Sequence, residues 1–158
     1  MANVKPIPDG YSTVTPYLFI KGAASAIDYY KKVFGAQEIM RLPAPNGLVG
    51  HAELKIGNSV IMLSDENPQW GTKGPHTLGG SATSLHVYVE NVDSVVQKAL
   101  AEGAQLHRPV KDQFYGDRSG SVVDPFGHLW SIATHIEDVS PEEIEKRMAV
   151  AMSQSASG

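Results

Sequence analysis

An imidazole and a carboxylate stand two residues apart in this chain, at His51 and Glu53. If Gly57-Asn58 is the two-residue turn of a hairpin, Glu53 lies opposite Met62 and His51 lies opposite Ser64. Side chains two apart on a strand point to the same face, so His51 and Glu53 project together. Such a pair suits acid–base chemistry, with Glu53 as the base, because partial burial in a cleft can raise a carboxyl pKa toward neutrality.

A second set of candidates comes from strand alternation in the other half of the chain. One face of residues 84–89 carries His86, which joins His51 and Glu53 as a candidate catalytic residue. Two histidines and a carboxylate could also hold a divalent metal, or they could form a hydrogen-bonded substrate pocket instead. The candidate ligand-binding residues are mostly aromatic: Tyr17, Phe19, Met62, Tyr88, Phe114, Tyr115, Trp130 and His135.

Several other conspicuous residues have structural interpretations. His76, His107 and His128 are expected to be structural, since a lone strand or turn histidine is more often a satisfied packing residue than a catalyst. Asp117-Arg118 is either an ion pair or loop anchor or a substrate clamp, and Trp130 suits core packing as well as a pocket wall. Trp70, in a Gly/Pro-rich segment, either covers a cleft or packs at a subunit interface.

The elements that must position these residues follow one order twice. A strand at 13–20, a helix at 23–34 ended by Gly35, and strands at 38–42, 48–56 and 60–64 make up the first half. The second half has a strand at 84–89, a helix at 92–102, and strands at 105–108, 119–123 and 129–134. The sequence therefore predicts an α+β fold of two βαβββ modules.

Both helices end in Gly-Ala-Gln, which favours a duplication over a chance likeness of two amphipathic helices. The predicted division is a first module at 10–64, a linker or lid at 65–81, a second module at 82–137, and a C-terminal helix with a frayed tail at 138–158. The helix start is indicated by Ser140-Pro141-Glu142-Glu143, which supplies an N-cap, a proline at N1 and acids in the first turn.

Composition narrows the class of protein. The 158 residues are 42% hydrophobic, enough to build a core, and 17 acidic residues against 13 basic ones give a net charge of −4. With no Lys/Arg cluster, neither nucleic acid nor a membrane is an expected partner. The absence of cysteine and of a long apolar segment makes a cytoplasmic location the default expectation.

Residues 116–135 carry the most specific pattern, because two apolar-rich strands flank the turn Asp124-Pro-Phe-Gly127. This hairpin resembles the last hairpin of the vicinal oxygen chelate superfamily, which comprises glyoxalases, bleomycin-resistance proteins and extradiol dioxygenases, and within it the PhnB-like branch. The resemblance covers about residues 10–138. It implies a curled mixed sheet, a cleft between the modules that takes a small molecule, and a homodimer.

The resemblance also implies where a metal would be held. Metal-dependent members use His and Glu from the first and last strand of each module, and the matching positions here are Thr15, Met62, Ser84 and Ser131. A thioether and three neutral hydroxyls would bind a hard divalent ion weakly at best. No cofactor is therefore expected, and a divalent metal moved to His51, Glu53 and His86 is the minority alternative.

Two classes of function follow from the resemblance. One is a glyoxalase-like enzyme, an isomerase or lyase acting on a small molecule without the usual metal ligands. The other is a non-catalytic protein that sequesters an antibiotic or metabolite. Glu53 discriminates them, since sequestration needs chiefly aromatic walls whereas catalysis needs a positioned group that titrates.

Overall fold

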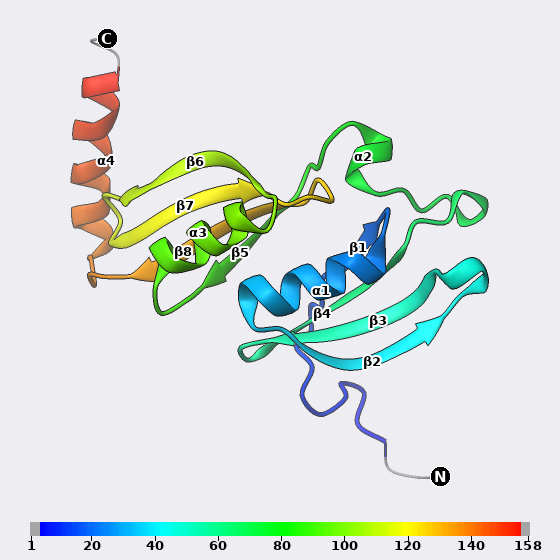
Figure 1. Cartoon of the computed structure of the whole chain (residues 1–158). Helices are drawn as coiled ribbons and strands as arrows, with labels where there is room; N and C mark the ends of the chain where they lie inside the picture. The colour runs from blue at the N-terminus through cyan, green and yellow to red at the C-terminus, as the bar shows by residue number, and fades with distance from the viewer. Residues whose placement is uncertain (1–3, 156–158) are drawn as a thin grey trace. The chain divides into compact units, whose positions relative to one another are not determined.

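The computed structural model describes residues 4–155. The chain forms two compact units, and the first holds residues up to Ala82 together with Pro125–His128. Its sheet has the strand order β1-β4-β3-β2, with β1 parallel to β4 and the other pairs antiparallel (Figure 1). The elements are β1 (Tyr17–Ile20), α1 (Ala23–Phe34), β2 (Gln37–Pro43), η1 (Pro45–Gly47), β3 (Val49–Ile56), β4 (Ser59–Asp65), η2 (Pro68–Trp70) and α2 (Pro75–Leu78).

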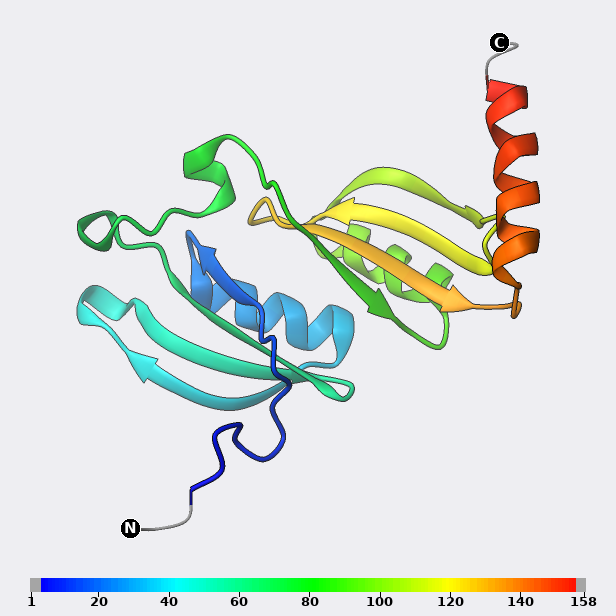
Figure 2. The ribbon, with the colours of Figure 1, turned by 180° about the vertical axis from the view of Figure 1, so that it is seen from behind.

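The second unit repeats this plan. Its strand order is β5-β8-β7-β6, again with one parallel pair, β5 with β8. The elements are β5 (Ser84–Tyr88), α3 (Val92–Ala101), β6 (Gln105–Asp112), β7 (Asp117–Val123), β8 (Leu129–His135) and α4 (Pro141–Ser155). The predicted α+β class with two βαβββ modules is confirmed. In each unit one helix, α1 or α3, covers one face of the sheet and leaves the other face without a helix (Figure 2).

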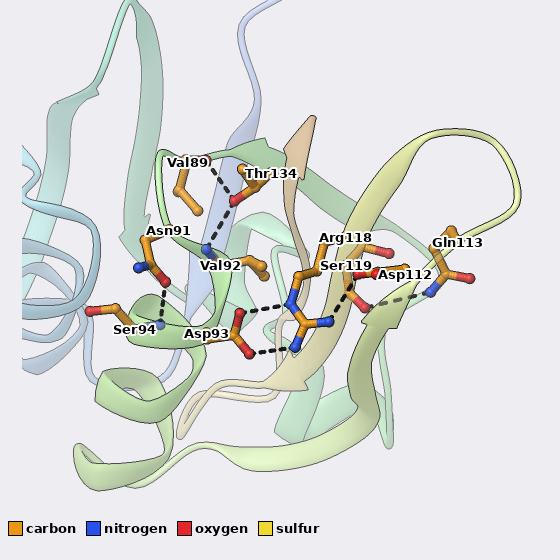
Figure 3. A network of polar contacts seen from close by, with 10 residues as sticks. All are labelled: Val89, Asn91, Val92, Asp93, Ser94, Asp112, Gln113, Arg118, Ser119 and Thr134. Carbon is orange, nitrogen blue, oxygen red and sulfur yellow. Dashed lines mark hydrogen bonds and ion pairs between the residues drawn. The ribbon is translucent and has the colours of Figure 1, made fainter. Parts of the chain in front are cut away.

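Equivalent residues hold the helix starts of the two units. In unit 1 the Asp65 carboxylate accepts hydrogen bonds from the backbone N–H groups of Gly22 and Ala23, each at 3.0 Å. In unit 2 the Thr134 hydroxyl accepts from Val92 N–H at 2.9 Å and donates to a carbonyl of the preceding loop (Figure 3). Both residues lie at the C-terminal end of the last strand of their module, Asp65 as the last residue of β4 and Thr134 as the next to last of β8, so each sheet fixes its own helix.

The strand registers also coincide. Cα partners across the first sheet form the row Tyr17, Met62, Glu53 and Met40, and across the second the row His86, Ser131, Ser121 and Arg108. Each edge strand has a register shift just before the last member of its row. The duplication therefore extends to individual positions and to a shared β-bulge.

Several predicted strand boundaries are wrong. β1 begins at Tyr17 rather than at residue 13, and Pro16, which has no backbone N–H to donate, precedes it. β6 reaches Asp112 instead of ending at residue 108. Segment 65–81, expected to be a linker or lid, contains η2, α2 and an isolated bridge between Asn67 and Thr72. The last helix runs to Ser155, and the expected frayed tail lies partly outside the described residues.

Residues Pro125–His128, which follow Asp124 in the turn of the last hairpin, belong to unit 1. The Phe126 ring meets the rings of Tyr29 and Tyr30 edge-on, with centroids 6.1 and 6.5 Å apart. The His128 Nε2 lies 3.1 Å from the carbonyl oxygen of Phe19, and the His76 Nε2 lies 2.8 Å from that of Pro125. These contacts give both histidines the structural roles expected of them. Over residues 4–155 no helix is both long and apolar enough to cross a membrane.

Candidate functional site

A hydrogen-bonded series of four side chains lies on the helix-free face of the sheet in unit 1. Tyr11 donates a hydrogen bond to Glu53 Oε2, and His51 Nε2 lies 3.1 Å from Glu53 Oε1. The hydroxyl of Tyr17 lies 3.0 Å from His51 Nδ1. Glu53 is only 6% exposed whereas Tyr17 is 40% exposed, so the part of the series from Glu53 to Tyr17 leads from a buried carboxylate to an accessible phenol.

Hydrogen bonding sets the charge of Glu53. The Tyr11 hydroxyl lowers the pKa of Glu53 most, burial opposes this, and His51 lowers it further. The expectation that burial would raise this pKa toward neutrality is therefore wrong, because the donors outweigh desolvation. The carboxylate in turn raises the pKa of Tyr11. An ionised Glu53 accepts from His51 Nε2–H, which leaves Nδ1 to accept from Tyr17.

Aromatic and apolar side chains surround this group. The Tyr17 ring lies 5.2 Å from that of Phe19 and 5.6 Å from that of His51, measured between centroids. Met62 is the Cα partner of both Tyr17 and Glu53, so it lies between them on the same face. The residues predicted from this half of the chain are thus brought together, and Tyr11, from the N-terminal segment, is the member that was missed.

The candidates from the second half form a separate group in unit 2. His86 Nδ1 lies 2.9 Å from the Ser131 hydroxyl, and its ring meets the Tyr88 ring edge-on at 4.8 Å. Tyr88 donates to the buried Asp117 at 3.0 Å, and His135 lies 2.8 Å from the same carboxylate. Hydrogen bonds to Asp138 and then Asp117 raise the pKa of His135, and the bond to Asp117 raises that of Tyr88.

Asp117 and Arg118 have different partners. The Arg118 guanidinium binds Asp93 at 2.8 Å through two nitrogens and Asp112 at 2.9 Å, as Figure 3 shows. The hydrogen bonds that Asp93 accepts from Arg118 hold the pKa of Asp93 below its usual value. Arg118 therefore anchors α3 to β7 and β6, which favours the structural alternative over a substrate clamp.

Trp130 and the pair Phe114 and Tyr115 lie in contrasting surroundings. Trp130 is 2% exposed and its indole N–H donates to Asp124 at 2.9 Å, so it packs in the core of unit 2 instead of forming a pocket wall. Phe114 and Tyr115, by contrast, line a pocket of about 510 Å³ in the same unit. Polar residues that the sequence did not single out as a site also line it: His107, Arg108, Gln113, Ser119 and Ser121.

The positions matched to the family's metal ligands do not fit a metal. The Thr15 hydroxyl donates to the Ser12 carbonyl at 3.3 Å, and the Ser131 hydroxyl is engaged with His86. With Met62 and Ser84 they offer no imidazole or carboxylate to a divalent ion. Within the described chain, no three His, Asp or Glu side chains gather in a way that could hold a metal. His86, the third member of the relocated set, lies in the other unit from His51 and Glu53.

The repeated βαβββ module places the chain in a class of proteins that are built from paired modules of this kind. A family model for the glyoxalase/bleomycin resistance protein/dioxygenase superfamily matches residues 12–132. The chain belongs to this superfamily.

The names of the relatives in sequence do not indicate a particular activity. An uncharacterized protein of Mycobacterium tuberculosis is 41% identical over 150 residues, which cover 93% of this chain and 85% of that protein. The protein YjdN of Escherichia coli is 25% identical over 140 residues, which cover 75% of this chain and 92% of its own.

Solved structures show the same fold. TioX from Micromonospora sp. ML1 superposes with a TM-score of 0.62 at 28% identity, over 79% of this chain and 99% of its own. A PhnB protein from Bacillus cereus gives a TM-score of 0.61 at 21% identity, over 78% of this chain and 99% of its own.

Proposed function

We propose that the chain binds a small molecule on the helix-free face of unit 1 and moves a proton on it through Tyr17, His51 and Glu53. The observation that carries this proposal is the hydrogen-bonded order of these three side chains, from buried carboxylate to exposed phenol. The same order of carboxylate, imidazole and hydroxyl activates a hydroxyl in hydrolases. Residues unsuited to a metal at the family's ligand positions support chemistry by side chains alone.

Each residue has a distinct role in this proposal. Glu53, ionised and occupied by two donors, is a positioning residue that fixes the His51 tautomer and stabilises the imidazolium. The Tyr17 oxygen takes a proton from a carbon or hydroxyl of the ligand while the phenol proton passes to His51 Nδ1. Return of the proton at another atom completes an isomerisation, and loss of a leaving group from the resulting carbanion completes a lyase reaction.

A sensitive test is the exchange of carbon-bound protons with D₂O, followed by proton NMR on a panel of 2-hydroxy ketones and 2-oxo acids. We expect exchange above the buffer rate for at least one compound, reduced about 10²–10⁴-fold in Tyr17→Phe and in His51→Asn. Glu53→Gln should reduce it similarly while leaving binding of that compound nearly unchanged. Exchange that survives Tyr17→Phe would contradict the proposal.

The sequestering alternative has one observation in its favour. Tyr17, Met40 and Leu42 are all exposed large side chains on this sheet, as an aromatic or apolar ligand would require. Tight binding of an aromatic ligand with no exchange, unaffected by Glu53→Gln, would support sequestration over catalysis.

A further inference from the structure

None of the residues of the proposed proton relay lines the pocket in unit 2. Its volume of about 510 Å³ falls within the range of about 300–1,000 Å³ typical of small-molecule sites. Its lining residues come from β5, β6, β7, β8 and the turn between β6 and β7, all within one unit. The pocket is therefore a feature of a single module.

Its polar lining favours negative charge. Four serine hydroxyls, from Ser84, Ser119, Ser121 and Ser131, are joined by an imidazole and a guanidinium, from His107 and Arg108. None of the described lining residues is acidic. For a chain with a net charge of −4, this is an unusual concentration of hydrogen-bond donors without a carboxylate.

Arg108 differs from the other three arginines. Arg41 binds Glu38, Arg118 binds Asp93 and Asp112, and Arg147 binds Glu137 and Glu143. Among residues 4–155, the side chain of Arg108 forms no hydrogen bond or ion pair. A guanidinium without a carboxylate partner, placed in a pocket, is available to a ligand.

Local structure brings Arg108 and His107 to this face. Register shifts on both sides of Arg108 bend β6, and His107, the residue skipped by the first shift, lies with Nδ1 2.9 Å from the Ser121 hydroxyl. The approach of β6 to β7 requires Gly120, since a Cβ there would lie 2.8 Å from Val110 Cγ2 and 3.1 Å from the Arg108 carbonyl oxygen. The bulge and the glycine together support Arg108 at the pocket.

We infer that this pocket binds a small organic molecule that carries an oxyanion group, a carboxylate or a phosphonate. The Arg108 guanidinium pairs with two oxygens of that group, and serine hydroxyls donate to the remaining lone pairs. Phe114 and Tyr115, whose rings meet edge-on at 5.2 Å, pack against the body of the ligand. The fork geometry of arginine gives the site a preference for planar or tetrahedral oxyanions over neutral groups.

The test uses four probes and the full chain: benzoate, phenylphosphonate, the neutral benzamide, and inorganic phosphate. Amide NMR titration should show benzoate or phenylphosphonate binding with a dissociation constant in the millimolar range or tighter, about −4 kcal/mol or better. Shifts should centre on Ser119, Ser121 and Tyr115. Benzamide should bind at least about tenfold more weakly, and inorganic phosphate should bind more weakly than phenylphosphonate because it lacks a ring.

Substitutions separate the charge from the fold and from the relay. Arg108→Gln, at an exposed position, should weaken binding of the acid probe at least about tenfold, whereas Lys111→Gln, which removes a charge from the same strand outside the pocket, should not. Glu53→Gln should also leave acid binding unchanged, which distinguishes this site from that of the proposed function. Equal binding of benzamide and benzoate, undiminished binding by Arg108→Gln, or no acid binding at all would overturn the inference.

Discussion

Replacing Tyr11 by phenylalanine removes a single hydroxyl and the hydrogen bond that does most to lower the pKa of Glu53. The Glu53 carboxylate remains buried and loses one of its two donors. A hydrogen bond to a charged group is worth about 1.5–3 kcal/mol. We therefore expect Tyr11→Phe to lower the free energy of unfolding by about 1.5–3 kcal/mol near neutral pH.

The pH dependence of this deficit follows from the sign of the pKa shift. The folded-state pKa of Glu53 is lowered, so its contribution to stability is present above the unfolded pKa, about 4.3, and is lost as the pH falls through the folded pKa. Once the carboxyl is protonated it is a weaker acceptor for Tyr11. The stability difference between Tyr11→Phe and the parent chain should therefore shrink under acid conditions.

Urea unfolding at about pH 7 and about pH 3 measures both effects, with the slope on denaturant checked for two-state behaviour. Tyr17→Phe is the matched control, because it deletes the same hydroxyl from a bond to an imidazole instead of a carboxylate and should cost only about 0.5–1.5 kcal/mol. A Tyr11→Phe deficit below about 0.5 kcal/mol at neutral pH, or one of equal size at both pH values, would refute the account of Glu53.

Three further changes test other parts of the molecule. Gly116→Ala should lower the free energy of unfolding, measured by thermal melts, by more than about 3 kcal/mol, because φ is 99° and a Cβ would lie 2.1 Å from the Glu137 carbonyl oxygen. Gly35→Ala is the control: φ is 65° but a Cβ there would meet open space, so the cost should be about 1–2 kcal/mol. Asp138→Asn should bring the pKa of His135 down toward its usual value in an NMR titration. In the parent chain the raised pKa of His135 stabilises the folded state at low pH, and this stabilisation is lost as the pH rises through the folded-state pKa. Trp70, 80% exposed, should tolerate Trp70→Ala without loss of thermal stability, and light scattering then tests whether it supports the homodimer predicted from the resemblance.

Local pattern was enough to predict the parts of the site that lie on one hairpin. The Gly57-Asn58 turn correctly paired Glu53 with Met62, because a slip of one residue would turn every side chain to the other face. The pairing of His51 with Ser64 is not part of the observed ladder, which ends at Ala52 and Leu63. Helical spacing and Gly35 likewise gave the bounds of α1 without error.

Contacts distant in sequence could not be predicted in this way. Tyr11 reaches Glu53 across 42 positions, and the direction of the Glu53 pKa shift depends on that contact. The turn of His107 toward Ser121 depends on a bulge in β6, which alternation alone does not reveal. Part of the pocket in unit 2 could nevertheless have been predicted from the sequence. Ser119 and Ser121 alternate along β7 with residues that face α3, so the two serines share the helix-free face.

The duplicated register explains how one module design supports two different surfaces. At equivalent positions that hold the fold together, the role is the same although the residue differs: Asp65 in unit 1 and Thr134 in unit 2 both cap a helix. The residues of the row across the helix-free face differ in chemical type between the units: Glu53 in unit 1 corresponds to Ser121 in unit 2, and Met40 corresponds to Arg108. One module thus presents a carboxylate among aromatic and thioether groups, and the other presents a guanidinium among hydroxyls. Because substitutions on the open face leave the core and caps intact, the two faces are free to differ in charge, and their ligands are expected to differ accordingly.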